Sequence, residues 1–316
     1  MLTKDDFLAA RERIRDHIVL TPLQGASSLS QMLGMDVFIK NETFQKTGAF
    51  KYRGVMNTLL STTKEELVAG VITASSGNHG KALATAASER EIAATVVLPS
   101  TAPLIKIQAL QHVHARIFFS EPQRRLQLAE KIAKEEGLLF IHPFNDLRVI
   151  AGQSTIGLEI LEQYPEVERI VVPMGGGGLI TGIASAVKTF RPEVEMVGAE
   201  TLNVPKFTYN LHRDVLAPTP EKPSAADAIV SNMPGTHTIE GVRRYVDRIV
   251  DVTEENILLA LKILVESEQV LCEPSSAVVL GAMLQEEFSP KKTVLVISGG
   301  NIDPDNLLGL IRRTSL

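Results

Sequence analysis

A lysine lies where a strand is expected to give way to a helix. The segment Asn41–Gly54 follows the apolar run Val37–Ile39, and within it Lys51 stands at the expected start of the helix. The positive end of a helix dipole disfavours an ammonium group, and partial burial would favour the neutral amine. A neutral lysine is a nucleophile that can form a Schiff base with a carbonyl compound. A single lysine is more often a charge exposed to water, so this segment alone leaves both interpretations open.

Small polar residues form a second candidate site. The segment Ser75–Gly80 reads Ser-Ser-Gly-Asn-His-Gly and lies between the apolar run Val71–Thr73 and an alanine-rich helical stretch. Without bulky side chains, the N–H groups at the start of a helix can approach an anion closely, and a carboxylate is the expected ligand. Serine and asparagine are also common helix caps, so an ordinary capped turn explains the segment equally well.

Four consecutive glycines, Gly175–Gly178, follow the strand predicted at Ile170–Val172. Their N–H groups can surround a phosphate. The third glycine of a dinucleotide-binding pattern would fall at Ile180, and the Lys-Ser/Thr pair of a P-loop is missing. We therefore expect a phosphate-bearing ligand that is not a dinucleotide. A flexible turn is the alternative, although four glycines cost considerable backbone entropy.

Alternating strands and helices must position these segments. Strands are predicted at Val37–Ile39, Val71–Thr73, Ala94–Leu98, Arg116–Phe119, Leu138–Ile141, Ile170–Val172, Met196–Gly198 and Val294–Ile297, and helices at Gly80–Ser88, Leu126–Lys134, Ala151–Gln163 and Glu255–Val265. This alternation indicates α/β architecture with largely parallel sheets, and we expect two packed domains with a cleft between them. Ligands bind beyond the carboxyl ends of such strands. Ser298 also follows a predicted strand, although its segment alone is more typical of a turn.

The composition excludes several classes of protein. The chain has 316 residues, 44% of them hydrophobic, and a formal net charge of −5. It shows no basic stripe for nucleic acid, no apolar run of about 20 residues for a membrane, and no signal-peptide pattern in its first residues. Cys272 is the only cysteine, so no disulfide can form within the chain. We expect a cytoplasmic enzyme that acts on a small molecule.

Together, the four segments resemble those of fold type II pyridoxal-phosphate enzymes, in particular the serine/threonine dehydratase and serine racemase family. The order and spacing match over nearly the whole chain, from Thr21-Pro22-Leu23 to Ser298–Asp303, with further matches at Val149–Gln153, Val197–Glu200 and Glu273–Ser275. The resemblance implies two α/β domains with a cofactor cleft between them. Residues 1–63 and 148–316 would form the large cofactor-binding domain, and residues 64–147 a small mobile one. It also implies pyridoxal 5'-phosphate as cofactor, an amino-acid substrate and a homodimer.

The same resemblance assigns roles by position. Lys51 would carry the cofactor and remove the Cα proton of the substrate, and Ser76 matches the acid or base on the opposite face in racemases. The residues that would bind the cofactor are Phe50, Lys51, Asn78, Gly175, Gly176, Gly177, Gly178, Leu179 and Ser298. Those that would bind the substrate carboxylate are Ser75, Ser76, Asn78 and His79. A neutral serine at the pyridine nitrogen, the place of Ser298, favours expulsion of a β-hydroxyl group.

The implied activity is that of an ammonia-lyase converting L-threonine, L-serine or both to a 2-oxo acid and ammonia by α,β-elimination. The alternatives within the family are a serine or other amino-acid racemase, and a dehydratase of another β-hydroxy amino acid such as 3-hydroxyaspartate. Outside it, a nucleotide-dependent oxidoreductase is disfavoured by the failed dinucleotide pattern. A cofactor-binding protein without catalytic activity is a further alternative.

Several positions depart from the family pattern. A usual serine is replaced by Ala49, and usual glycines are replaced by Ser154, Ala228 and Ser276. These changes bear on the substrate more than on the type of reaction. An arginine that reaches the substrate side in racemases aligns with Arg124 or Arg125, although an exposed helix charge is the favoured interpretation.

The metal site of racemase-like members also differs. Glu200 is retained, while Lys206 stands at the later aspartate position. The ammonium group of Lys206 could substitute for a divalent cation, or the residue could be an unrelated lysine on the surface of a changed loop. We therefore predict no metal site.

Overall fold

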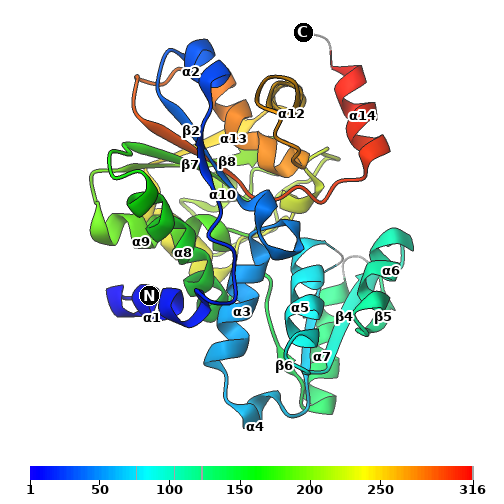
Figure 1. Ribbon diagram of the computed structural model, residues 1–316. Helices are drawn as coiled ribbons and strands as arrows, with labels where there is room; N and C mark the ends of the chain where they lie inside the picture. Colours follow the sequence, from blue (N-terminus) through cyan, green and yellow to red (C-terminus); the bar gives the residue numbers. More distant parts are fainter. Residues whose placement is uncertain (76, 103, 122–123, 315–316) are drawn as a thin grey trace.

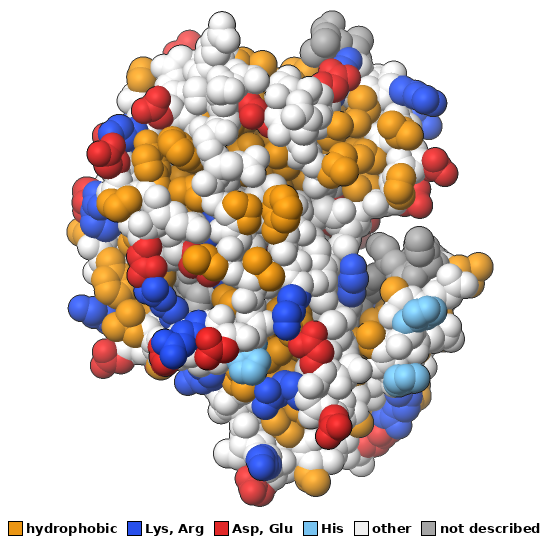
Figure 2. Space-filling model, in the orientation of Figure 1, with side chains coloured by type: hydrophobic (Ala, Val, Ile, Leu, Met, Phe, Trp, Pro, Cys, Tyr) orange, Lys and Arg blue, Asp and Glu red, His pale blue; other side chains and the backbone are white. Residues whose placement is uncertain are grey.

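Two β-sheets, each packed with helices, make up the protein (Figure 1). This computed structural model describes residues 1–75, 77–102, 104–121 and 124–314. In Figure 1 the larger sheet lies in the upper part of the view and the smaller sheet at the lower right. A hollow lies between the two parts on the right-hand side of the space-filling view (Figure 2).

The larger sheet has six strands in the order β1-β2-β10-β7-β8-β9. The edge pair β1–β2 is antiparallel, and the other pairs are parallel. The strands are β1 (Leu23–Gly25), β2 (Val37–Asn41), β7 (Arg169–Pro173), β8 (Glu195–Thr201), β9 (Arg248–Val252) and β10 (Thr293–Ile297). The central strands β7 and β10 are buried along their whole length, which explains their nearly continuous apolar sequences.

The smaller sheet has four strands in the order β5-β4-β3-β6, and all its pairs are parallel. The strands are β3 (Val71–Ala74), β4 (Ala94–Pro99), β5 (Arg116–Ser120) and β6 (Leu139–Phe140). The two sheets together confirm the predicted α/β architecture with largely parallel strands.

Helices fill the connections between the strands. They are α1 (Lys4–Ile14), α2 (Ser27–Leu33), α3 (Lys51–Ser61), α4 (Lys64–Leu67), α5 (Asn78–Ser88), α6 (Leu104–His112), α7 (Arg125–Glu136), α8 (Leu147–Gln163), α9 (Gly178–Phe190), α10 (Lys206–Asn210), α11 (Thr236–Tyr245), α12 (Glu254–Glu268), α13 (Pro274–Gln285) and α14 (Pro304–Arg313). Short 3-10 turns in the described residues are η1 (Glu42–Phe44), η2 (Lys46–Gly48) and η4 (Asp227–Ile229). In the described part of the chain, no helix has both the length and the apolar character to cross a membrane.

Helix α3 connects the two sheets. Its apolar residues, among them Tyr52 and Met56, belong to the same buried cluster as Val71 of β3. On another side α3 packs against α8, where a Cβ atom added to Gly152 would lie 2.5 Å from the Cα of Gly54. This close approach explains why both helices carry a glycine at their contact. It also fixes the first turn of α3, which begins with Lys51.

The predicted strands all occur, and their ends differ by a few residues. The largest change is at Met196–Gly198, which lengthens to β8, Glu195–Thr201, while Leu138–Ile141 shrinks to β6, Leu139–Phe140. The four predicted helices occur as parts of the longer helices α5, α7, α8 and α12. The short edge strand β1 and the strand β9 were not predicted, because neither shows a long apolar run: β1 has three residues, and β9 includes Arg248 and Asp251.

Candidate active site

The candidate segments of the larger sheet meet at one edge. Ile297, the last residue of β10, pairs with Asn41, the last residue of β2. On the other side of β10, Leu295 pairs with Val171 of β7. Since the three strands are parallel, the segments that follow them leave the sheet at the same edge. The segments that lead to Lys51, to the four glycines and to Ser298 therefore begin at one edge of the larger sheet, where ligands bind in parallel sheets.

Lys51 is the first residue of α3 and contacts the segment that follows β6. Its Nζ atom donates a hydrogen bond of 2.6 Å to the carbonyl oxygen of Pro143 and lies 5.0 Å from the ring centroid of Phe50. Burial lowers the pKa of Lys51 to about 8, and the carboxylate of Glu273 opposes this shift. A substantial fraction of the amine is thus neutral near physiological pH, which is the state that attacks a carbonyl carbon.

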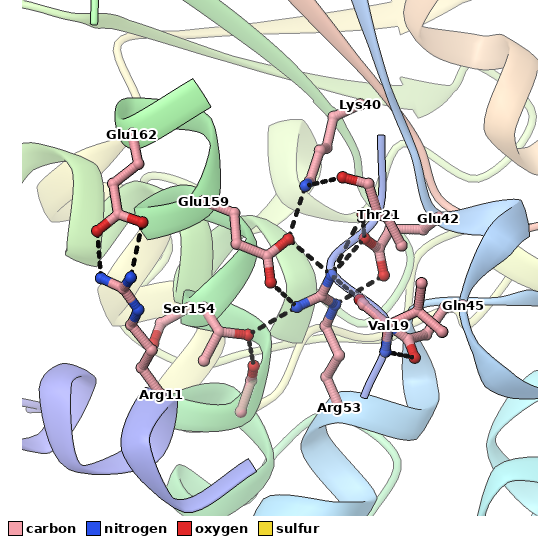
Figure 3. Close-up of polar contacts among 12 residues, drawn as sticks. Arg11, Val19, Thr21, Lys40, Glu42, Gln45, Arg53, Ser154, Glu159 and Glu162 are labelled. Carbon is pink, nitrogen blue, oxygen red and sulfur yellow. Dashed lines mark hydrogen bonds and ion pairs between the residues drawn. The ribbon is translucent and has the colours of Figure 1, made fainter. Parts of the chain in front are cut away.

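A buried network holds this first turn of α3 in place (Figure 3). The side chain of Arg53 contacts Glu42, which follows β2, and Glu159 of α8. Lys40 of β2 also contacts Glu159, with 2.6 Å between Nζ and Oε2. We call Lys40, Glu42, Arg53 and Glu159 the buried quartet. Because its members come from β2, η1, α3 and α8, the quartet ties the first turn of α3, which begins with Lys51, to the elements around it.

Ser298 and Phe50 are joined through the backbone. The N–H of Phe50 donates to the carbonyl oxygen of Ser298 at 2.9 Å, and Ala49 forms an isolated bridge with Gly299. The hydroxyl of Ser298 lies 3.0 Å from that of Ser276, at the start of α13. The departure from glycine at position 276 therefore places a second hydroxyl beside Ser298.

The four glycines form the turn from β7 into α9. Gly177 has φ of +91°, and a Cβ atom on it would lie 2.4 Å from the ring of Phe207. A Cβ atom on Gly176 would lie 2.2 Å from the ring of Phe144. Other residues at these two positions would therefore be strained or would clash. The N–H groups that open α9, including that of Leu179, have no partner within the helix and are available to an anion.

The segment after β3 faces the same region. Asn78 opens helix α5, and its side chain contacts two residues from the larger sheet's side: its amide donates to Glu273 at 2.9 Å, and its oxygen accepts from Asn301 at 2.8 Å. Asn78 therefore links the smaller sheet's helix to the segments around Ser298. Ser75 lies partly buried, and its hydroxyl accepts from the N–H of Gly77. Ser76 lies outside the described residues.

The ring of His79 is buried against the start of the segment that follows β6. Its Nε2 lies 3.3 Å from the carbonyl oxygen of Ile141, and its Nδ1 is buried without a hydrogen-bond partner among the described residues. Burial and the nearby Lys51 hold the pKa of His79 well below its usual value, so the ring is neutral. Any contact of His79 with a carboxylate would thus come from its backbone N–H in the first turn of α5.

The segment Ile141–Asn145 is part of the site, and the sequence interpretation missed it. Besides the Pro143 carbonyl and the Phe144 ring, it carries His142, whose Nδ1 accepts from the N–H of Phe144 and the N–H of Asn145. Burial, together with Lys51, lowers the pKa of His142 to about 4. The available signal was position: the segment follows a predicted strand, as the other candidate segments do.

Lys206 is not a surface residue, so the alternative that it is an unrelated lysine on the surface of a changed loop was wrong. Its side chain is fully buried, with Nζ 3.1 Å from the carbonyl oxygen of Met174 and 3.3 Å from Oε2 of Glu200. Burial lowers the pKa of Lys206 while Glu200 opposes the shift. Met174 immediately precedes the glycine turn, so this amine connects the turn to β8. The prediction that no metal is bound stays a prediction.

The other residues that depart from the family pattern lie at different distances from the glycine turn. Ser154 is buried in α8 and donates to the carbonyl of Ala151, in the contact with α9. Ala228 lies next to the turn, since a Cβ atom on Gly175 would be 3.5 Å from its carbonyl oxygen. Arg124 is an exposed helix charge, as favoured from the sequence, and pairs with Glu121.

Comparison with known proteins identifies the family. A family profile described as "Pyridoxal-phosphate dependent enzyme" matches residues 14–300. The chain is 40% identical to the L-threonine ammonia-lyase of Thermotoga maritima over 99% of this chain and 79% of the relative. It is also 40% identical to the serine racemase of Bos taurus over 96% of this chain and 93% of the relative. The structure of maize serine racemase superposes with a TM-score of 0.92 at 34% identity, covering 98% of this chain and 96% of that one. The resemblance found in the sequence is thus confirmed, and the chain belongs to the family of pyridoxal-phosphate dependent enzymes.

Proposed function

We propose that this protein is an ammonia-lyase that converts L-threonine, L-serine or both to the 2-oxo acid and ammonia by α,β-elimination. The observation that carries the proposal is the amine of Lys51, whose pKa of about 8 makes it reactive at the edge where the glycine turn and Ser298 meet. Relatives named threonine ammonia-lyase at 40% and 39% identity support the substrate class.

The residues present fit pyridoxal phosphate. Lys51 supplies the amine for its aldehyde, and the glycine turn supplies N–H groups without side chains in front of them for its phosphate. Phe50 and Asn78 lie within the same set of contacts and would flank the ring. Ser298 supplies a neutral hydroxyl that suits a pyridine nitrogen.

The residues of the chain have separate tasks in the reaction. Bound pyridoxal phosphate supplies an electron sink that stabilises a carbanion at Cα. The N–H groups at the start of α5, with Ser75 and Asn78, hold the substrate carboxylate. Lys51 would accept the Cα proton, because burial leaves a substantial fraction of its amine neutral. Loss of the β-hydroxyl as water leaves an aminoacrylate, which hydrolyses to the 2-oxo acid and ammonia.

Cofactor trapping tests the site. The purified holoenzyme is reduced with borohydride and digested, and the peptide that carries the label is identified by mass spectrometry. We expect the label on Lys51, a visible absorption band that disappears in Lys51→Ala, and ammonia release from L-threonine and L-serine. Absence of label from Lys51, or a colourless protein after reconstitution, would reject the proposal.

Racemisation is the second candidate function. It is supported by the serine racemases among the relatives, at 40% identity for the bovine protein. Ser76 would be the acid or base on the face opposite Lys51. Chiral analysis of the products from L-serine separates the two activities, since pyruvate without D-serine rejects racemisation. A panel containing 3-hydroxyaspartate tests the remaining substrate alternative.

The cytoplasmic location, the homodimer and the domain division are part of the proposal. Residues 64–147 would form a small domain that moves against the rest of the chain when substrate binds. Light scattering after size-exclusion chromatography tests the dimer. Amide hydrogen exchange with and without an unreactive substrate analogue tests the movement. We expect the analogue to increase protection only in residues 64–147 and at the edge of the larger sheet that faces them.

A further inference from the structure

A pair of serine hydroxyls lies at the position proposed for the ring nitrogen of the cofactor. The Oγ atoms of Ser276 and Ser298 are 3.0 Å apart, and the two side chains are 0% and 4% exposed. Ser276 also contacts both backbone groups of Gly299: its hydroxyl donates to the carbonyl at 2.8 Å and accepts from the N–H at 2.9 Å. Three hydrogen-bonding groups thus converge on one hydroxyl.

Counting protons decides which way the pair is oriented. A serine hydroxyl has one proton and two lone pairs. The N–H of Gly299 uses one lone pair of Ser276, and the carbonyl of Gly299 is the nearer and better acceptor for its proton. The remaining lone pair of Ser276 faces Ser298 and can accept its proton. Ser298 then presents only lone pairs to a ligand on its other side.

From this arrangement we propose that Ser276 is a positioning residue that acts through Ser298 to favour the protonated form of the cofactor's ring nitrogen. A protonated ring nitrogen donates to the hydroxyl of Ser298. That hydroxyl donates to Ser276, and Ser276 donates to the carbonyl of Gly299, so every donor in this series of hydrogen bonds has an acceptor. An unprotonated ring nitrogen can only accept a hydrogen bond, so the hydroxyl of Ser298 must donate to it. Two lone pairs then face each other at 3.0 Å, or Ser276 gives up its bond to Gly299. The protonated form keeps one more hydrogen bond.

Ser276 deepens the proposed function, on which this inference rests. With glycine or alanine at position 276, the hydroxyl of Ser298 would lose its acceptor and would donate to the ring nitrogen instead. That arrangement favours the unprotonated ring, as expected for Ser298 alone. Ser276 would therefore strengthen the electron sink that bound pyridoxal phosphate supplies.

Charged groups near Ser276 and Ser298 are the same in wild type and in a Ser276 variant. The ionisable groups in the neighbouring segments are Glu273 before α13, Lys51 of α3, Lys81 of α5, which contacts Asn301, and the buried Cys272. None of them is changed by substituting Ser276. A difference between wild type and a Ser276 variant therefore reports on the hydroxyl.

The experiment measures the ring nitrogen directly. Wild type, Ser276→Gly and Ser276→Ala are reconstituted with pyridoxal phosphate labelled with 15N in the ring, and the 15N chemical shift is followed against pH. We expect the midpoint for ring protonation to fall by about one pH unit in both variants, a roughly tenfold change in the protonated ratio, as for loss of one hydrogen bond. Ser275→Ala is the matched control. Its hydroxyl lies on the same helix turn but accepts from Ala228, so its midpoint should equal that of wild type.

Each outcome supports or overturns the inference. Midpoints of the Gly and Ala variants that equal or exceed the wild-type value would overturn it. Ser276→Thr keeps a hydroxyl and should restore the wild-type midpoint, and a threonine variant that behaves like the glycine variant would also overturn it. A wild-type protein that takes up no cofactor at Lys51 would reject the proposed function itself, whereas normal loading with unchanged midpoints rejects only the role of Ser276.

Discussion

Arg53 donates two hydrogen bonds to Glu42, one from Nε to Oε2 and one from Nη2 to Oε1, both at 2.8 Å. Both side chains are fully buried. Glu42→Gln would leave the buried quartet with one uncompensated positive charge. We expect the free energy of unfolding of the apoenzyme to fall by about 3–5 kcal/mol, as for other broken buried ion pairs. Urea denaturation followed by circular dichroism measures this loss.

Arg11 and Glu162 provide the matched control, because they also form a paired contact of arginine with carboxylate, but at the surface (Figure 3). Their side chains are 42% and 53% exposed, so Glu162→Gln should cost less than about 1 kcal/mol. Equal losses in Glu42→Gln and Glu162→Gln would show that the buried quartet does not support α3.

Gly177→Ala should weaken cofactor binding and destabilise the protein. The added methyl group would lie 2.4 Å from Phe207 and 2.8 Å from Thr238, at a backbone φ of +91°. The left-handed conformation alone costs about 1–2 kcal/mol for a residue other than glycine. Gly309→Ala, in α14, is the control: nothing lies within 4 Å of its added Cβ, so it should be neutral or stabilising by about 0.5–1 kcal/mol. Cofactor titration and thermal unfolding compare the two variants. Similar cofactor affinity and stability in both would contradict the role of the glycine turn in binding the phosphate.

Reloading of the apoenzyme should report the pKa of Lys51. The neutral amine attacks the aldehyde, so the rate rises with pH and levels off above the pKa. We expect the rate to reach half its maximum near pH 8 and to level off above that, whereas a lysine at the ordinary 10.5 would keep gaining rate through pH 10. Stopped-flow absorbance measures the rate. Glu273→Gln removes the charge that raises the pKa of Lys51, so the rate in this variant should level off at a lower pH than in wild type. A variant whose rate levels off at the same or a higher pH would contradict the assignment of this pKa to Lys51.

Chelation should leave the wild-type activity unchanged. The buried ammonium of Lys206 already compensates Glu200 and holds the Met174 carbonyl, so no divalent cation is needed there. Lys206→Ala removes that charge, and we expect weaker cofactor binding that Mg²⁺ partly restores. Ammonia assays with EDTA and with Mg²⁺ on both proteins measure this. Loss of most wild-type activity on chelation would show that Lys206 does not take the place of a cation.

Much of this site follows from local sequence. Apolar runs such as Ile170–Val172 and Val294–Ile297 predict buried parallel strands, and the residues that follow them must meet at one edge of the sheet. That reasoning places Ser298 and the glycines at the same edge of the sheet from the sequence alone. Lys51 follows from its place at a helix start, and its role from the resemblance of the surrounding segment to the family.

Contacts between distant segments were not predictable in this way. The Phe144 ring covers Gly176, although the two residues lie in different connections of the chain. The hydroxyl of Ser276 meets Ser298 only because α13 packs beside the end of β10. Lys206 lies in a polar, irregular stretch, and its burial depends on the Glu200 carboxylate and a backbone carbonyl that hydropathy does not reveal. Each of these depends on packing geometry.

The buried quartet contains two positive and two negative side chains, so its formal charges sum to zero. Dissolved ions screen charges that water can reach, over about 8–10 Å at physiological ionic strength, and they have little effect on pairs enclosed by protein. The first turn of α3 is therefore held by an internally neutral set of charges that an ionic atmosphere does not enter. The position of Lys51 should accordingly be insensitive to the salt concentration around the enzyme.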